Sequence, residues 1–156
     1  MIMEYITRND IMQHIPEAYR HFFDLRVDTI SPNLERTFKL FTQAVNILCE
    51  FADINKKADI FFNLGNKGQA YSENLLLNYE IRGNAIHIHY NNCIFFDIAK
   101  SSLYSEPLQL AMYLEELCHC YMNIKDEVLV KVVVANICPN IIYNVESDQY
   151  EELTEN

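Results

Sequence analysis

The spacing of apolar residues changes along this chain from a helical period to a strand period and back, and this order limits the folds that it can adopt. In residues 10–27, apolar side chains recur at three- and four-residue steps, which predicts an amphipathic helix. Ser31 and Pro32 suit a helix start, because serine caps the first turn and proline fits within it. They predict a second helix over about residues 33–52, whose apolar stripe is Leu34, Phe38, Phe41, Val45, Leu48 and Ala52.

The middle of the chain carries strand patterns. Residues 58–64 form a short apolar run, and residues 69–81 follow as a second candidate strand. Between residues 86 and 90, apolar side chains alternate with histidines at the two-residue period of a strand, and residues 93–98 predict another strand. Because the connections between these segments are short, we expect a small antiparallel sheet.

Helical patterns return after this sheet, over about residues 105–123 and 127–137. The order of elements predicts an α+β fold in which helices flank a small mid-chain antiparallel sheet. A length of 156 residues suits one domain, which we expect over residues 1–145. Acidic side chains dominate residues 146–156, which we expect to form a solvated C-terminal tail.

The chain is strongly acidic. Its 12 Lys and Arg residues are outnumbered by 22 Asp and Glu residues, so its formal net charge is −10. This charge repels nucleic acid and anionic lipid, and the longest basic cluster is only Lys56 and Lys57. No apolar run approaches the roughly 20 residues that span a bilayer. We therefore expect no direct binding to nucleic acid and no membrane association.

The cysteines and the N-terminal segment predict a cytoplasmic protein. The first ten residues have no basic start followed by an apolar core, so we expect no secretory signal. An odd number of cysteines without a Cys-x-x-Cys pair favours reduced thiols that act as small buried hydrophobes. These cysteines are Cys49, Cys93, Cys118, Cys120 and Cys138.

One short motif, Glu115-Glu116-x-x-His119, carries the chemistry of a metal site. On a helix, Glu115 and His119 are four residues apart and share a face. A carboxylate oxygen and an imidazole nitrogen placed in this way can hold one divalent metal. Glu116 lies one step around the helix, where we expect it to act as a general base toward a water made more acidic by the metal.

This motif resembles the HExxH helix of the zincin metallopeptidases, with Glu115 in place of the first histidine. Small zincin-like proteins place a helix, a short antiparallel sheet, the motif helix and a further helix in this order, and residues 33–137 follow it. The resemblance implies that Glu115 and His119 are metal ligands and that Glu116 is the catalytic base.

The same resemblance implies a third ligand just after the motif helix, where Asp126 and Glu127 are the candidates. It implies zinc as the cofactor, although an anionic Glu115 in place of a neutral histidine favours a harder metal such as manganese. Two outcomes stay open. The chain is either a metal-dependent peptidase acting on a protein or peptide, or a scaffold that has lost catalysis and kept binding.

His87 and His89 are further candidate ligands, because they project from the same face of the predicted strand over residues 86–90. In a zincin-like domain, an edge strand flanks the motif helix, so this pair could supplement or replace a missing ligand. The alternative is a pair of half-exposed strand histidines beside water.

Two other chemistries fit the motif less well. Glu116 and His119 have the Glu-x-x-His spacing of di-iron helix bundles, but these need a second copy of the motif and the sequence has none. Cys118 and Cys120 flank His119, but on a helix their side chains point about 200° apart. They therefore cannot coordinate the same ion.

A different class of function is consistent with the charge. A small acidic chain could be a non-enzymatic protein that binds and inhibits another protein by docking on a basic surface, as inhibitors from phages and mobile elements do. This alternative predicts no metal and a continuous acidic face, which could include residues 146–155.

Overall fold

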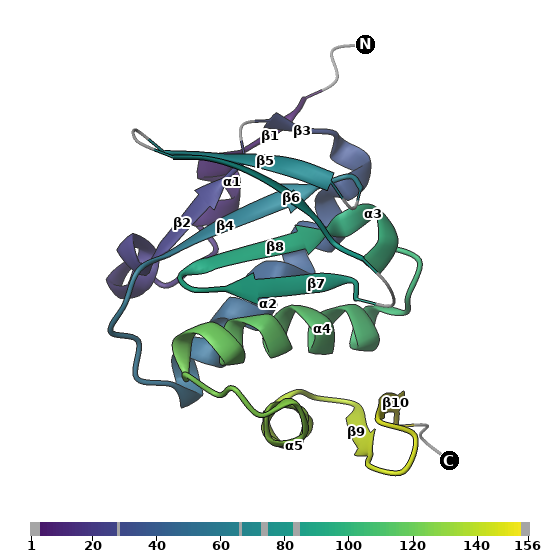
Figure 1. Ribbon diagram of the computed structural model, residues 1–156. Helices are drawn as coiled ribbons and strands as arrows, with labels where there is room; N and C mark the ends of the chain where they lie inside the picture. The colour runs from purple at the N-terminus through teal and green to yellow at the C-terminus, as the bar shows by residue number, and fades with distance from the viewer. Residues whose placement is uncertain (1–3, 28, 66, 73–74, 83–84, 154–156) are drawn as a thin grey trace.

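A central four-stranded sheet organises the protein, and two long helices cover one of its faces (Figure 1). The computed structural model describes residues 4–27, 29–65, 67–72, 75–82 and 85–153. The strands of the sheet lie in the order β2-β4-β8-β7 and are β2 (Phe23–Arg26), β4 (Ala58–Asn63), β7 (His87–Tyr90) and β8 (Cys93–Asp97). The covering helices are α2 (Glu35–Phe51) and α4 (Glu106–Tyr121). The predicted α+β class is confirmed.

The sheet is mixed, so the expectation of an antiparallel sheet is wrong for two of its three strand pairs. β2 pairs with β4 and β4 pairs with β8 in parallel, and only β7 and β8 form an antiparallel hairpin. The long connection through α2 returns the chain to the same end of the sheet, which makes β2 and β4 parallel. Short connections in the sequence therefore identified the hairpins but not the pairing between distant strands.

The single helix expected over residues 10–27 is also wrong. This region contains a short helix α1 (Arg8–Met12), a 3₁₀ helix η1 (Glu17–Phe22) and strand β2. Pro16 breaks the helical pattern because it lacks a backbone N–H and disfavours helical geometry in the residue before it. Two-residue strands β1 (Ile6–Thr7) and β3 (Thr29–Ile30) pair with each other beside this region.

Helix α2 follows the sequence prediction closely. A 3₁₀ turn η2 (Pro32–Leu34) leads into it, and its predicted stripe is buried at Phe38, Phe41, Val45 and Leu48. Phe41 is fully buried, and its ring meets Tyr113 of α4 and Phe62 and Phe96 of the sheet. Burial of an aromatic side chain of this size contributes about 1.5–3 kcal/mol, so this contact anchors both helices to the sheet.

A second hairpin covers the other face of the sheet. Of the single strand expected over residues 69–81, residues 69–72 lie in β5 (Lys67–Ser72) and residues 75–80 lie in β6 (Leu75–Glu80), and these two strands are antiparallel. Tyr79 of β6 packs against Phe95 of β8 with a distance of 4.2 Å between the ring centroids. This contact belongs to a smaller apolar cluster, separate from the main core under α2 and α4.

The C-terminal part of the chain packs on the side of α4 that faces away from α2 (Figure 1). It consists of α5 (Glu127–Ile137) and an antiparallel hairpin of β9 (Ile141–Asn144) and β10 (Gln149–Glu152). Residues 149–152 were expected in a solvated tail, but β10 contacts α4 and its Tyr150 packs against the main core. Residues 154–156 of the expected tail lie outside the described residues.

Helix α3 (Ile98–Ser101) is a single turn that connects β8 to the segment before α4. None of the helices in the described ranges combines the length and the apolar character needed to cross a membrane.

Candidate metal centre

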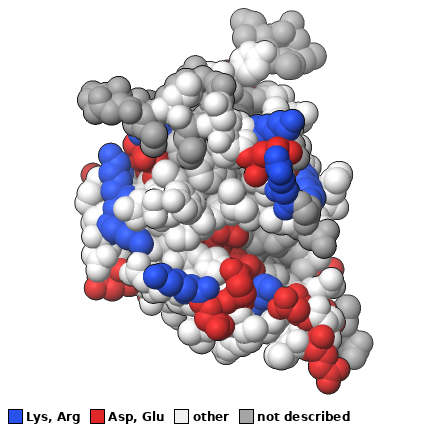
Figure 2. All heavy atoms as spheres, viewed as in Figure 1, with Lys and Arg blue, Asp and Glu red and all other residues white. Residues whose placement is uncertain are grey.

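A cleft of about 1030 Å³ opens between α4, the start of α5 and strand β7. In Figure 2, acidic side chains gather over the lower part of the molecule, where α4 and α5 lie, with basic side chains beside them. The cleft is lined by Glu115, Glu116, His119 and Glu127 and also by His87, His89, Lys56 and Lys131. All but one of the predicted site residues therefore line one cavity.

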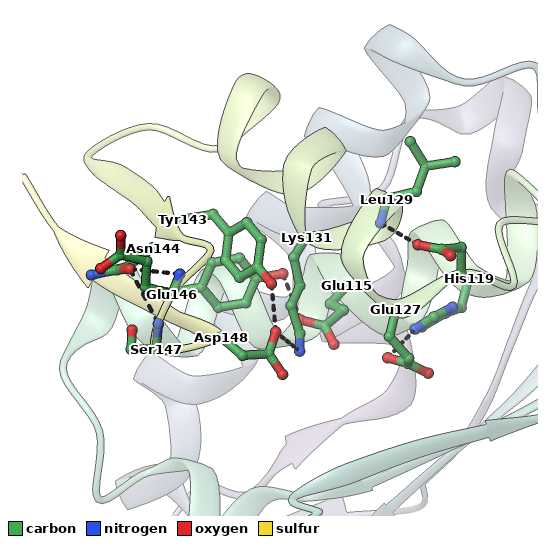
Figure 3. Close-up of polar contacts among 12 residues, drawn as sticks. Glu115, His119, Glu127, Leu129, Lys131, Tyr143, Asn144, Glu146, Ser147 and Asp148 are labelled. Carbon is green, nitrogen blue, oxygen red and sulfur yellow. Dashed lines mark hydrogen bonds and ion pairs between the residues drawn. The ribbon is translucent and has the colours of Figure 1, made fainter.

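Three side chains come close enough to hold one ion. Ligand atoms of Glu115, His119 and Glu127 all lie within 4.8 Å of one another (Figure 3). Helix α4 places Glu115 and His119 one turn apart on the same face. Glu127 is the first residue of α5, and its Oε2 lies 3.4 Å from Nε2 of His119. The group therefore joins two helices that the chain connects through a short turn.

The turn after α4 orients the imidazole of His119. The Nδ1 atom of His119 donates to the carbonyl oxygen of Ile124 at 2.6 Å. A proton on Nδ1 leaves Nε2 with a free lone pair, and Nε2 is the atom that faces Glu127. Metal-binding histidines are commonly held in this way by a backbone carbonyl. The side chain of His119 is only 9% exposed, and its Nε2 lies beside the carboxylate of Glu127.

Glu115 is held by a residue that the sequence analysis missed. The hydroxyl of Tyr150 in β10 donates to Oε2 of Glu115 at 2.5 Å. Burial raises the pKa of Glu115 above its ordinary value, while the Tyr150 hydrogen bond and the charge of Lys131 act in the opposite direction. No pattern in the sequence could have connected Tyr150 to Glu115, because they are 35 residues apart and their contact depends on how the hairpin docks.

Glu116 lines the same cleft beside the group of three. Burial raises the pKa of its carboxyl to about 8, and the charges of Glu115 and Glu127 add to this rise. A carboxyl with this pKa is mostly protonated at pH 7, and a positive charge beside it would favour the ionised form that a general base needs.

The structure does not bring Asp126 into the group. Asp126 is the N-cap of α5, and its Oδ1 accepts the backbone N–H of Leu129 at 2.7 Å. A cap carboxylate is turned toward the first turn of its own helix. Of the two candidates for a third ligand, Glu127 is therefore the one that reaches Glu115 and His119.

His87 lines the cleft but is buried, and it takes part in the packing of the sheet on α4. Its Nδ1 accepts the backbone N–H of Asp97 at 3.0 Å, and its ring stacks on Tyr113. Burial lowers the pKa of His87 to about 3, so the imidazole is neutral at physiological pH. Its Nε2 is buried without a hydrogen-bond partner in the part of the chain that the structure describes. His87 lies outside the group of three.

His89 lies next to the group without joining it. Its ring is nearly parallel to that of His119, with 6.3 Å between the ring centroids. Its Nε2 lies 2.5 Å from the carbonyl oxygen of Asn91, so this nitrogen is engaged by the β7–β8 turn. The expected pair of strand histidines therefore separates into a packing residue, His87, and a neighbour of the site, His89.

Lys131 is a second residue of the cleft that the sequence analysis did not identify. It lies one turn after Glu127 on α5, lines the cleft and is paired with Asp148 at 2.9 Å (Figure 3). Its charge favours the ionised form of Glu115 and so partly offsets the effect of burial on that carboxylate. The spacing of Glu127 and Lys131 at four residues could have indicated their shared helix face.

The donor set fits a divalent ion. One imidazole nitrogen and two carboxylates are ligands that zinc and manganese accept in proteins. The five cysteines are free thiols, and Cys118, Cys120 and Cys138 are buried.

Comparison of the chain with protein-family models, with curated proteins and with solved structures gives no match.

Proposed function

We propose that this protein binds a divalent metal ion, zinc or manganese, through Glu115, His119 and Glu127. The observation that carries the proposal is the approach of their ligand atoms to within 4.8 Å of one another. The bond from His119 to Ile124 supports it, because it presents a free Nε2 to the other two ligands. A divalent cation would also balance the charge of the two carboxylates in this group.

We further propose that the site hydrolyses peptide bonds, in keeping with the resemblance of the Glu115-Glu116-x-x-His119 motif to the zincin helix. When bound, the ion would polarise a peptide carbonyl and raise the acidity of water. Glu116 would accept the proton of the attacking water and pass it to the leaving amine. The volume of the cleft, about 1030 Å³, leaves room for a peptide segment, so a protein or peptide is the proposed substrate. The free thiols support a cytoplasmic location.

Metal analysis tests the first proposal. Untagged protein purified without chelator, and then given zinc or manganese, should retain one ion per chain. His119→Ala should lose this ion, because it removes the imidazole ligand. His14→Ala is the matched control, since His14 is exposed and lies outside this cleft. Equal metal content in wild type and His119→Ala would contradict the proposal, as would wild-type protein that holds no metal.

A second experiment tests the hydrolytic role of Glu116. Wild-type protein loaded with metal should cleave peptides in a degradation assay followed by mass spectrometry. Glu116→Gln should keep the metal and lose cleavage, because the amide cannot accept the proton. If Glu116→Gln cleaves as fast as wild type, Glu116 is not the base.

One observation favours the alternative of a non-enzymatic binding protein. Large apolar side chains are exposed on α5 and on β9; they are Val128, Leu129, Val132 and Ile142. Exposed apolar surface rimmed by charge is typical of a protein interface. This alternative predicts that His119→Ala still binds the partner protein, while Val128→Ser combined with Val132→Ser abolishes this binding.

A further inference from the structure

The C-terminal hairpin reaches the candidate metal centre through one side chain. Tyr150 lies in β10, opposite Tyr143 of β9, and its hydroxyl donates to Oε2 of Glu115. The rest of the Tyr150 side chain packs against the main core. A strand near the end of the described chain is therefore in direct contact with a residue of the motif helix.

The hairpin is held in this position by further contacts. Asp148 accepts hydrogen bonds from Lys131 of α5 at 2.9 Å and from Tyr143 at 2.5 Å (Figure 3). The backbone N–H of Leu153 donates to the carbonyl oxygen of Asn140 and closes the base of the hairpin. The Lys131–Asp148 bond ties the hairpin to α5 and Tyr150 ties it to α4, while the other two bonds lie within the hairpin.

We infer that Tyr150 is a positioning residue for the metal ligand Glu115, and that the C-terminal hairpin is thereby a working part of the metal site. This inference rests on the proposed function. A carboxylate has about four lone-pair positions on its two oxygens. Tyr150 occupies one of them and leaves the others for an ion, so it restricts the rotation of Glu115 without displacing the metal.

The contact has a thermodynamic consequence. Hydrogen bonds to metal ligands from residues behind them raise affinity because they hold the ligand ready to bind. Coupling between two equilibria is reciprocal. If the docked hairpin increases metal affinity, metal binding must stabilise the docked hairpin by the same free energy. Metal should therefore protect the hairpin from local opening, and this protection should depend on the Tyr150 hydroxyl.

The test compares full-length wild type, Tyr150→Phe and Tyr143→Phe in competition titrations of Zn²⁺ and Mn²⁺ against a chromophoric chelator. Tyr150→Phe should weaken metal binding by about 10- to 100-fold. Tyr143→Phe is the matched control, because Tyr143 lies opposite Tyr150 in the same hairpin. Its hydroxyl is bonded to Asp148 and not to Glu115. This variant should bind metal as wild type does.

Hydrogen exchange of the hairpin amides separates positioning from structural support. Without metal, Tyr150→Phe lacks the hydroxyl bond to α4 and should protect residues 141–152 somewhat less than wild type, so the change in protection on adding metal is the quantity to compare. Added metal should slow exchange there in wild type and have less effect in Tyr150→Phe.

Each contrary result has a distinct meaning. Equal affinity of wild type and Tyr150→Phe overturns the role of Tyr150 and leaves the metal site standing. An equal gain in hairpin protection on adding metal to wild type and to Tyr150→Phe assigns the tyrosine a purely structural role and also overturns the inference. A wild-type protein that binds neither ion overturns both the inference and the proposed function.

Discussion

The imidazole of His119 is anchored to the carbonyl oxygen of Ile124, five residues further along the same chain, at 2.6 Å. The bond is possible because α4 ends at Tyr121 and Asn123 turns the backbone with a positive φ of 56°. The chain then comes back beside the last turn of the helix. The segment that ends the motif helix therefore also orients its histidine.

This turn leads to a first prediction. Asn123→Ala should lower the free energy of unfolding by about 1–2 kcal/mol relative to Asn123→Gly, because only glycine adopts the left-handed region without a penalty. Both variants lose the amide that accepts a hydrogen bond from Lys56, so their difference isolates the backbone conformation. Urea denaturation measures it, and equal midpoints and slopes for the two variants would contradict the prediction.

The contrast between Asp126 and Glu127 leads to a second prediction. Asp126→Ala should cost about 0.5–2 kcal/mol of stability, because it removes the N-cap of α5, while Asp126→Asn should retain most of the stability. Asp126→Asn should bind metal as wild type does, whereas Glu127→Gln should bind it weakly. Thermal denaturation and metal titration of the three variants check both parts. Weak metal binding by Asp126→Asn would contradict the prediction, because it would indicate that Asp126 is a metal ligand.

A third prediction concerns acid stability. Burial against Tyr113 lowers the pKa of His87 to about 3, whereas an unfolded histidine titrates near 6.5. As pH falls from about 6.5 to about 3, the unfolded state takes up a proton that folded His87 does not, so the folded state loses stability. The contribution approaches about 1.4 kcal/mol per pH unit. In His87→Gln, the slope of unfolding free energy against pH between 6 and 4 should fall by up to this amount.

The slope is the informative quantity for His87, because His87→Gln also changes packing at every pH. Chemical denaturation at several pH values gives it directly. Parallel curves for wild type and His87→Gln would show that His87 does not control acid sensitivity in this range.

A fourth prediction concerns the hairpin on the other face of the sheet. A Cβ atom at Gly68 would collide with Oη of Tyr79 and Nδ2 of Asn63, two buried polar atoms without partners among the described residues. Gly68→Ala should therefore lower the free energy of unfolding by about 1–3 kcal/mol. Gly65→Ala is the matched control, because the space around a Cβ there is open, and its stability should stay close to wild type.

The Tyr79 ring offers a check on the cause. The losses from Gly68→Ala and Tyr79→Leu should be less than additive, because leucine removes both Tyr79 atoms that would collide with the new Cβ, Oη and Cζ. Additive losses from the two substitutions, measured by urea denaturation, would show that the collision is relieved in another way.

Much of the helical structure was predictable because it depends on local spacing. The stripe of α2 and the common face of Glu115 and His119 follow from the 3.6-residue period of a helix, and the structure agrees with both. At the N-terminus the same reasoning was wrong, because the strand character of β2 depends on its pairing with β4. A periodic pattern interrupted by Pro16 did not contain this information.

The candidate site divides in the same way. The sequence by itself determined the motif helix, its paired glutamates and histidine, and the candidates for a third ligand, because neighbours on a helix face are set by residue numbers alone. Only the tertiary structure decided that Glu127 rather than Asp126 faces His119, that His87 is buried by Tyr113, and that Tyr150 bonds Glu115. These contacts join separate elements, and their geometry depends on how the helices, the sheet and the hairpin pack around a shared core, which local spacing does not specify.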